Sequence, residues 1–217
     1  MNNLILFSGG LDSTTLLYKE TARSKQKVTA LFFNYGQKSL KRERAAVCEI
    51  TKQRGVRLME MDITAIFQNS KSSLIMHNSS PITQTITHGN YRTFRSQNTE
   101  VEFRNGVFIT AAISLAMQVF EGQRVDILYG AIKTRESFAD CTKGFVEYFN
   151  QLAISCSKGL IKVSAPYLEM GKDEIYKEAV CMGVPLSLTW SCYEGGVEPC
   201  GRCPACLDRK ILEGINC

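Results

Sequence analysis

The apolar residues of this chain fall into short runs, separated by longer segments that mix apolar and charged residues. Short, nearly continuous apolar runs are typical of strands that are buried on both faces of a sheet. Such runs begin at residue 4 and recur at 27–33, 57–61, 125–129 and 160–163. The segments between them have the composition of helices, at 14–19, 40–54, 103–120, 144–155 and 172–181.

This alternation of strand and helix predicts an α/β fold with an open, mostly parallel, doubly wound sheet. Segment 40–54 carries its apolar residues, Val47 and Ile50 among them, on one side, as expected of a helix that covers a sheet. Segment 103–120 is apolar nearly all round and is predicted to be a helix buried against the sheet. In such folds ligands bind beyond the carboxyl ends of the strands, where the strand order reverses.

One long segment breaks the alternation. Between residues 68 and 100 the chain is rich in Ser, Thr, Asn and Gln and poor in apolar residues, a length that is uncommon for a structureless loop inside a compact domain. We expect a lid-like insertion over the active site. Its two histidines, His77 and His88, are expected to be ordinary exposed loop residues, and a catalytic histidine here is the less favoured interpretation.

Length and composition favour one principal α/β domain. A chain of 217 residues with 44% hydrophobic content can bury one sizeable core. No basic leader precedes the first apolar run, so no signal peptide is expected. The longest apolar stretch, 107–120, contains Thr110, Ser114 and Gln118 and is too short to span a bilayer. These features predict a cytoplasmic protein without a membrane partner.

The charge balance is mildly basic, with 26 basic and 21 acidic residues and a net charge of +5. This excess suits an anionic small molecule such as ATP. Proteins that bind nucleic acids usually show a clustered basic face. The densest basic run, 38–44, is interleaved with Glu43 and is typical of a solvated helix face, so no stable nucleic-acid partner is expected.

The first strand runs into the sequence SGGLDST, residues 8–14, which has the features of a turn that holds pyrophosphate. Gly9 and Gly10 allow unusual backbone angles and close approach to an anion, and the following helix start offers unpaired N–H groups. A Walker loop is excluded, because no GxxxxGK[ST] pattern occurs in the chain. The alternative is a Ser/Gly turn that only begins a helix.

The ends of the other predicted strands should line the same crevice, at 34–37, 130–131 and 165–166. Phe33, Asn34 and Tyr35 are candidates to lie against an adenine, since they end the second strand. The alternative for Phe33 is core packing, and for residues 34–36 it is a simple turn.

A cysteine cluster lies near the C-terminus. Four residues, Cys192, Cys200, Cys203 and Cys206, provide the thiolates that a closed tetrahedral zinc site requires. Such a site leaves no open position, so the metal would hold the tail in place without activating water. An iron–sulfur cluster, disulfides and a redox dithiol are the alternatives. The remaining cysteines have no ligand spacing and are expected to be buried or incidental: Cys48, Cys141, Cys156, Cys181 and Cys217.

Taken in order, these motifs resemble the 7-cyano-7-deazaguanine synthase family of the PP-loop ATP pyrophosphatase superfamily. The resemblance spans almost the whole chain and leaves only 68–100 uncovered. It rests on FSGGLDSTT at 7–15, FNYGQK at 33–38, Arg104-Asn105, Asp140-Cys141, MGKDEI at 170–175 and TWSCYEGG…CGRCPACLDR at 189–209.

The resemblance implies an ATP-dependent ligase with an adenine nucleotide alpha-hydrolase-like fold. Its ATP-binding domain would span 1–188 and a zinc-binding tail 189–217. The carboxylate of 7-carboxy-7-deazaguanine would be adenylated with release of pyrophosphate, and ammonia would displace AMP to give an amide. A second adenylation would yield the nitrile used in queuosine synthesis. The implied cofactors are ATP, Mg²⁺ and Zn²⁺, and a homodimer is expected.

The resemblance also implies roles for residues. Asp12, Ser13 and Lys172 are the expected catalytic residues, although Lys172 has the alternative of an exposed lysine at a helix start. The expected ATP-binding residues are Phe7, Ser8, Gly9, Gly10, Leu11, Asp12, Ser13, Thr14, Phe33 and Tyr35. The expected substrate-binding residues are Gln37, Arg104, Asn105, Gly130 and Asp140.

The chain departs from the family pattern where the substrate should bind. The family loop reads like SGYPDCRPEF, whereas residues 137–145 lack the Tyr-Pro pair, have Thr142 after the cysteine and are one residue shorter. A second hypothesis is therefore a paralogue that transfers the activated deazaguanine to an amine of a partner protein. Such paralogues occur in bacterial antiphage gene clusters.

Two other classes are weaker matches. A tRNA-thiolating PP-loop enzyme needs a reactive cysteine near the loop, and here only Cys141 is a candidate. A zinc-ribbon module that binds nucleic acid would leave SGGLDST unexplained and would need no ATP.

Overall fold

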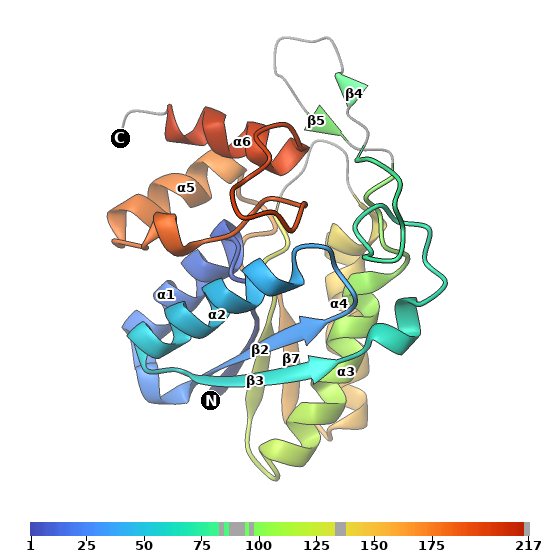
Figure 1. The fold of residues 1–217 in the computed structure, drawn as a ribbon. Helices are drawn as coiled ribbons and strands as arrows, with labels where there is room; N and C mark the ends of the chain where they lie inside the picture. Colours follow the sequence, from blue (N-terminus) through green and yellow to red (C-terminus); the bar gives the residue numbers. More distant parts are fainter. Residues whose placement is uncertain (83–84, 87–93, 96–97, 133–137, 215–217) are drawn as a thin grey trace.

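The computed structural model describes residues 1–82, 85–86, 94–95, 98–132 and 138–214. A five-stranded sheet forms the centre of the molecule, with the strand order β3-β2-β1-β6-β7 and every neighbouring pair parallel (Figure 1). Its strands are β1 (Asn2–Leu6), β2 (Val28–Asn34), β3 (Arg57–Asp62), β6 (Val125–Leu128) and β7 (Ile161–Ser164). The short antiparallel pair β4 (Thr85–Ile86) and β5 (Phe94–Arg95) stands apart from this sheet.

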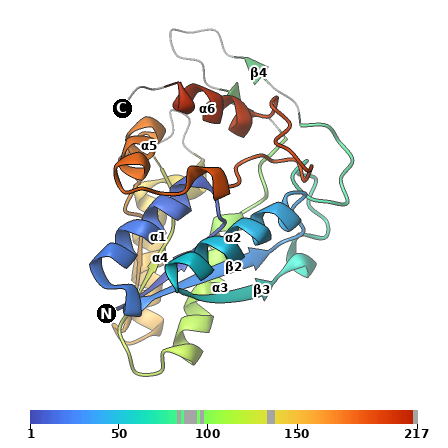
Figure 2. The same cartoon turned by 60° about the vertical axis from the view of Figure 1, so that its left-hand side comes forward.

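Helices cover both faces of the sheet. They are α1 (Leu11–Ser24), α2 (Leu40–Arg54), α3 (Arg104–Val119), α4 (Lys143–Cys156), α5 (Lys172–Cys181) and α6 (Pro204–Glu213). Figures 1 and 2 show α1, α2 and α5 on one face of the sheet and α3 and α4 on the other. Four single 3₁₀ turns complete the described structure, at Lys25–Lys27, Thr64–Phe67, Ala139–Cys141 and Leu186–Leu188.

The two cores follow from the alternation of side chains along the strands. Leu4 and Leu31 point into the core beneath α3 and α4, whereas their neighbours Ile5 and Phe32 point into the core beneath α1, α2 and α5. All four side chains are buried. Strands buried on both sides explain why the apolar runs in the sequence are nearly continuous.

The predicted α/β fold is confirmed, and the helices expected at 40–54 and 172–181 have those bounds as α2 and α5. Helix α3 packs against the sheet as predicted, but its burial is confined to one face. Ile109, Ala112 and Ile113 are buried there, whereas Met117 is 46% exposed. Helix α6 was not predicted, because the cysteines and the proline that surround its start obscure its amphipathic pattern.

The point where strand order reverses lies between β1 and β6. From β1 the chain moves to β2 and then β3 on one side, and it later returns to β6 and β7 on the other. The turn 8–14 follows β1 directly, so the fold places it at the position where α/β sheets bind ligands.

The first part of the polar segment 68–100 is ordered against the sheet rather than free of it. Ser72, Ser73 and Ile75 are buried, and the Lys38 N–H donates to the Leu74 carbonyl over 2.8 Å. His77 is exposed, as expected. His88 lies outside the described residues, as do 83–84, 87–93 and 96–97 of the expected lid.

The C-terminal tail packs back onto the main body through α6, whose Leu212 is buried in the core beneath α1, α2 and α5. The guanidinium of Arg209 donates to Thr189 Oγ1 over 2.9 Å and to the Leu186 carbonyl over 2.8 Å. Among the helices of the described residues, none has the length and hydropathy needed to cross a bilayer.

Candidate active site

A cavity of about 380 Å³ opens at the carboxyl ends of the strands, within the size range of small-molecule sites. We call the part of the cavity around the turn 8–14 the phosphate end and the part around the start of α3 the acceptor end, after the ligands expected there. Its lining includes Phe7, Ser8, Gly10, Leu11, Asp12, Ser13, Phe33, Tyr35, Ser39, Glu43, Leu74, Arg104, Asn105, Phe108, Tyr129, Gly130, Phe138, Cys141, Lys172, Trp190, Ser191, Tyr193 and Ala205.

The turn at the phosphate end is held by its own hydroxyl groups. Ser8 N donates to Ser13 Oγ over 3.3 Å, and Ser13 Oγ donates to the Gly10 carbonyl over 3.3 Å. Gly10 caps α1 without any side-chain hydrogen bond. The first N–H groups of α1 are therefore available to an anion, and the helix dipole adds positive potential there.

Close packing explains why two glycines border this turn. Gly9 has φ 73°, in the left-handed region, and a Cβ there would lie 3.0 Å from Ala46 Cβ and 3.3 Å from the Glu43 carbonyl on α2. At the end of β6, a Cβ on Gly130 would lie 3.5 Å from Ser13 N. The glycines thus allow α2 and β6 to press against the turn from opposite sides.

Charged groups converge on the phosphate end. Burial raises the pKa of Asp12, although Lys172 opposes the shift. Burial alone would lower the pKa of Lys172, but Asp12 and Asp208 outweigh it, so the lysine stays charged. Oδ1 of Asp12 is buried and has no hydrogen-bond partner among the described residues. A carboxylate oxygen without a protein partner beside an anion-binding turn fits a hard cation such as Mg²⁺.

The acceptor end is built around Arg104, in the first turn of α3. Its Nη1 donates to the Tyr35 hydroxyl over 3.3 Å, and its guanidinium lies 5.5 Å from the Tyr35 ring centroid and 5.9 Å from that of Phe108. Nε of Arg104 is buried without a partner among the described residues. A planar cation with a free donor suits a carboxylate ligand. Asn105, the next residue, lines the same wall.

Glu43 lines the cavity, which corrects its assignment to a solvated helix face. Its carboxylate accepts hydrogen bonds from Ser39 Oγ over 2.6 Å and from Gln37 Nε2 over 3.0 Å. Burial raises its pKa, and these two bonds oppose the shift. The prediction of a solvated face is confirmed for Lys41 and Arg44, which are exposed. Glu43 differs because the first turn of α2 lies over the end of β2.

The predicted substrate residue Gln37 does not line the cavity. It is 1% exposed, and its side-chain amide binds the Tyr35 N–H and the Phe33 carbonyl as well as Glu43. Gln37 therefore shapes the loop that carries Tyr35. Asn34 makes a local turn, since its Oδ1 accepts from Gly36 N over 3.1 Å.

Phe33 packs in the core as considered, since it stacks on Phe108 with 4.4 Å between ring centroids, and it also lines the cavity. Of the residues predicted to be catalytic, ATP-binding or substrate-binding, twelve line the cavity. Four do not: Gly9, Thr14, Gln37 and Asp140. Asp140 is adjacent, since its Oδ1 accepts from the Cys141 thiol over 3.7 Å.

Two tyrosines and a tryptophan of the lining were missed by sequence reasoning. Trp190 and Tyr193 flank the ligand candidate Cys192, and their aromatic character beside that motif was the available signal. Trp190 N donates to the Gly9 carbonyl over 2.9 Å, so the tail contacts the phosphate turn directly. Tyr129, at the end of β6, has a buried hydroxyl without a partner among the described residues.

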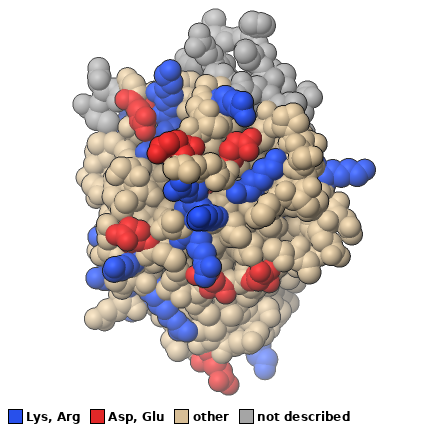
Figure 3. Space-filling view, viewed as in Figure 1, with Lys and Arg blue, Asp and Glu red and all other residues tan. Residues whose placement is uncertain are grey.

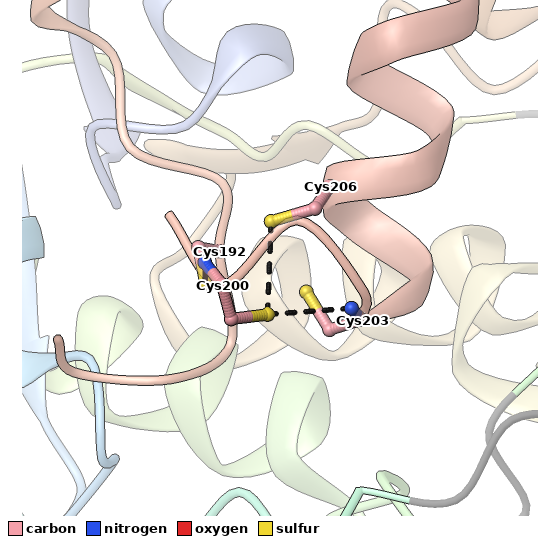
Figure 4. A group of neighbouring side chains, drawn as sticks. All are labelled: Cys192, Cys200, Cys203 and Cys206. Atoms are coloured by element: carbon pink, nitrogen blue, oxygen red, sulfur yellow. Dashed lines mark hydrogen bonds between the residues drawn. The ribbon is translucent and has the colours of Figure 1, made fainter. Parts of the chain in front are cut away.

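The four cysteines of the tail point toward one another (Figure 4), and their sulfur atoms all lie within 4.8 Å of one another. Cys200 Sγ lies 3.9 Å from Cys206 Sγ and accepts from Cys203 N over 3.3 Å. The thiol of Cys192 donates to Cys203, which lowers the pKa of Cys203. Four sulfurs at this spacing fit a tetrahedral zinc ion.

The other cysteines lie apart from this cluster. These cysteines were expected to be either buried or incidental. Cys48, Cys156 and Cys181 are exposed, so they are incidental rather than buried. Cys141 lines the cavity at partial exposure, and burial raises the pKa of its thiol to about 12. Cys217 lies outside the described residues.

Comparison with known proteins identifies the family of this chain. The family model "Queuosine biosynthesis protein QueC" matches residues 2–213. A 7-cyano-7-deazaguanine synthase of Caldicellulosiruptor saccharolyticus is 34% identical over 96% of this chain and 89% of its own length. That of Psychromonas ingrahamii is 32% identical over 98% and 93%.

Among solved structures, an NMN synthetase from Francisella tularensis aligns with a TM-score of 0.47 and 12% identity. The alignment covers 86% of this chain and 63% of the NMN synthetase chain. The family match and the relatives cover nearly the whole sequence, including the turn, Arg104-Asn105 and the cysteine tail. The chain therefore belongs to the QueC family of queuosine biosynthesis proteins.

Proposed function

We propose that this chain is an ATP-dependent synthase that adenylates the carboxylate of 7-carboxy-7-deazaguanine and converts it, through an amide, to 7-cyano-7-deazaguanine. One observation carries the proposal. The turn 8–14 faces the same cavity as the guanidinium of Arg104. Among the described residues, neither Oδ1 of Asp12 in this turn nor Nε of Arg104 has a hydrogen-bond partner. The first suits Mg²⁺ and ATP, and the second suits the carboxylate to be activated.

In the proposed first step, a substrate carboxylate oxygen attacks the α-phosphorus of ATP and the bond to the β-phosphate oxygen breaks. Pyrophosphate leaves toward the turn 8–14, where the N–H groups of α1 and Lys172 stabilise its charge. Ser13 lies in the first turn of α1 and lines the cavity, where its hydroxyl completes the phosphate site. Arg104 and Asn105 orient the carboxylate for this attack.

In the proposed second step, ammonia attacks the acyl carbon, AMP leaves with the electrons of the broken C–O bond, and the nitrogen loses a proton to solvent, giving the amide. The amide oxygen then attacks the α-phosphorus of a second ATP with release of pyrophosphate, and loss of AMP and the remaining nitrogen protons yields the nitrile. The chain supplies positioning and charge stabilisation for both steps. Residues 68–100 would act as a lid that keeps water from the acyl-adenylate.

The cysteine tail would bind zinc as a structural ion. Four thiolates fill a tetrahedral zinc shell, so the ion has no position for substrate or water. Within the proposed organisation, residues 1–188 form the ATP-binding domain and 189–217 the zinc-binding tail.

A second candidate is the paralogue that transfers the activated deazaguanine to a protein amine. It is favoured by the altered acceptor loop, in which Thr142 replaces the arginine of the family pattern and caps α4 by accepting from Phe145 N. In this chain the residue after Cys141 therefore serves helix α4 and carries no cation toward the cavity.

Two remaining candidates are less well supported. The raised pKa of Cys141 keeps its thiol protonated at neutral pH, which argues against tRNA thiolation through this residue. A nucleic-acid module would need a clustered basic face, whereas Figure 3 shows acidic side chains among the basic ones on the face it presents.

One incubation separates the two leading candidates. The protein is mixed with Mg²⁺, ATP, 7-carboxy-7-deazaguanine and ammonium, and AMP, pyrophosphate and the nitrile are quantified. Stoichiometric AMP with free nitrile supports the synthase and excludes the paralogue. AMP without nitrile supports the paralogue, because ammonium is then not the acceptor. The absence of AMP defeats the adenylation proposal.

We also propose a homodimer. Tyr148 and Leu152 on α4 are 75% and 51% exposed, next to the aromatic cluster of Phe103, Phe145 and Phe149. Such a patch favours contact with a second copy. Light scattering of the wild type and of a Tyr148→Glu variant tests it, and a monomeric wild type would contradict it.

A further inference from the structure

Asp208 on α6 lies beside Lys172, which lines the cavity. The Lys172 ammonium and the Asp208 carboxylate are 3.8 Å apart, and each side chain is about one-third exposed, at 33% and 35%. The separation exceeds that of a hydrogen bond, so the pair is held by charge alone. Lys172 is thus attracted by Asp208 while its ammonium donors stay available to a ligand.

Lys172 needs such a partner because of where it stands in the fold. It is the first residue of α5, where the helix dipole is positive and disfavours a cation. Acidic residues of the same first turn, Asp173 and Glu174, offset part of this, but Glu174 is engaged by the Gly171 N–H over 2.7 Å. The carboxylates that raise the pKa of Lys172 are Asp12 and Asp208.

These two carboxylates are in different situations. Asp12 lies within the phosphate turn, and its Oδ1 has no partner among the described residues, which leaves it available to a metal ion. Asp208 lies outside the turn, on α6. If Lys172 paired with Asp12, it would neutralise the group that the metal requires. Asp208 offers the lysine a counter-charge that leaves Asp12 unoccupied.

The position of Asp208 is fixed by the cysteine tail. Helix α6 begins at Pro204, directly after Cys203, and carries Cys206 in its first turn. The next residue after Asp208, Arg209, ties the same helix to Thr189 and Leu186. The carboxylate is therefore held on a short helix whose start carries two of the four clustered sulfurs.

We propose that Asp208 is a positioning residue for Lys172, through which the cysteine tail places the cation at the phosphate end of the cavity. This inference rests on the proposed function, since it takes Lys172 to contact nucleotide phosphates. The tail thereby has a role in nucleotide binding beyond closing the fold.

The test measures binding of Mg²⁺ and α,β-methylene-ATP, an analogue that cannot be cleaved between the α- and β-phosphates, by titration calorimetry. Asp208→Asn should raise the dissociation constant about five- to tenfold, as expected for loss of a partly exposed charge pair next to a bound anion. Asp208→Glu should restore most of the affinity, because it keeps the charge.

Glu213→Gln is the matched control. It removes a carboxylate from the same helix and breaks the 2.7 Å ion pair with Arg209, which does not face the cavity. We expect wild-type affinity. Metal content is measured for each variant, since Asp208→Asn should retain the zinc of the wild type. An affinity loss that occurs only together with metal loss would overturn the inference, because Asp208 would then serve the tail alone.

A double-mutant cycle with Lys172→Ala shows whether Asp208 acts through the lysine. In the Lys172→Ala background, Asp208→Asn should not weaken binding further. Wild-type affinity for Asp208→Asn, or an equal loss in both backgrounds, overturns the inference and leaves the proposed function standing. A wild-type protein that does not bind the analogue would defeat both. One that binds it but releases no pyrophosphate from ATP would defeat the proposed function alone.

Discussion

The phosphate end and the acceptor end of the cavity are built in different ways. The phosphate end is built mainly from one short segment, the turn 8–14, of which Ser8, Gly10, Leu11, Asp12 and Ser13 line the cavity. The acceptor end brings together Tyr35 from the end of β2, Arg104 from α3, Tyr129 from the end of β6 and Cys141 from the loop before α4. One end is a local structure, and the other exists only in the folded protein.

This difference bears on how each end tolerates change. A backbone site needs glycines and correct helix geometry but few particular side chains. An assembled site depends on the identity of every contributing side chain, and each contributing loop varies independently. In the resemblance drawn from the sequence, the turn 8–14 keeps the family pattern, whereas residues 137–145 depart from it. The following predictions test this contrast, from the largest expected effect to the smallest.

Asp12→Asn should have the largest effect, since in the proposed function the Asp12 carboxylate binds the Mg²⁺ ion of the phosphate end. We expect release of pyrophosphate from ATP to fall about a thousandfold, because the amide cannot compensate the charge of Mg²⁺. Asp62→Asn, which changes an exposed carboxylate at the end of β3, is the control and should leave the rate unchanged. A variant that keeps a tenth of the rate would contradict the assignment.

Arg104→Gln tests the acceptor end. We expect kcat/KM for the carboxylate substrate to fall about a hundredfold, with affinity for ATP nearly unchanged, because a charge-assisted contact to the carboxylate is lost. Arg54→Gln is the matched control, since Arg54 also covers a tyrosine, with its guanidinium 4.4 Å from the Tyr18 ring, but lies outside the cavity. If the two ends were coupled, Arg104→Gln would also weaken ATP binding.

Gly9→Ala examines the backbone of the phosphate end. We expect affinity for ATP to fall about tenfold, because the methyl group meets α2 and the turn must shift. Gly122→Ala separates this effect from backbone strain. Gly122 has φ 70°, close to the 73° of Gly9, but a Cβ on Gly122 would meet no other atom of the described residues within 4 Å.

Both glycine variants should lose about 1 kcal/mol of folding stability from the left-handed backbone, measured by denaturant unfolding. Only Gly9→Ala should change ATP affinity. Equal ATP affinities for the two variants would mean that crowding by α2 has no part in shaping the turn.

Tyr35→Phe should have the smallest effect. It removes the hydroxyl that accepts the 3.3 Å hydrogen bond from Arg104 while keeping the ring beneath the guanidinium. We expect kcat/KM for the carboxylate substrate to fall about threefold, the usual size of one partly compensated hydrogen bond. Burial raises the pKa of Tyr35 to about 12, so the effect should be the same from about pH 7 to pH 9. A strong pH dependence would assign Tyr35 a proton-transfer role instead.

Prediction from the sequence succeeded where structure is local. The helices α2 and α5 have the expected bounds, and the cysteines expected to share a metal cluster together. The roles of Glu43 and Gln37 were not predictable in the same way. Helical periodicity places Glu43 on a charged face, but only the position of α2 over the end of β2 turns that face toward the cavity. Gln37, expected at the substrate, is instead enclosed by the loop it shapes.

The sequence by itself determined the α/β alternation, the turn 8–14 and the cysteine tail, because hydrophobic period, glycine conformation and ligand spacing act over a few neighbouring residues. Only the tertiary structure decided that Arg104 meets Tyr35, that Trp190 meets Gly9 and that Asp208 meets Lys172. These pairs join segments far apart in the chain, and their contact depends on strand order and helix packing, which no local pattern records.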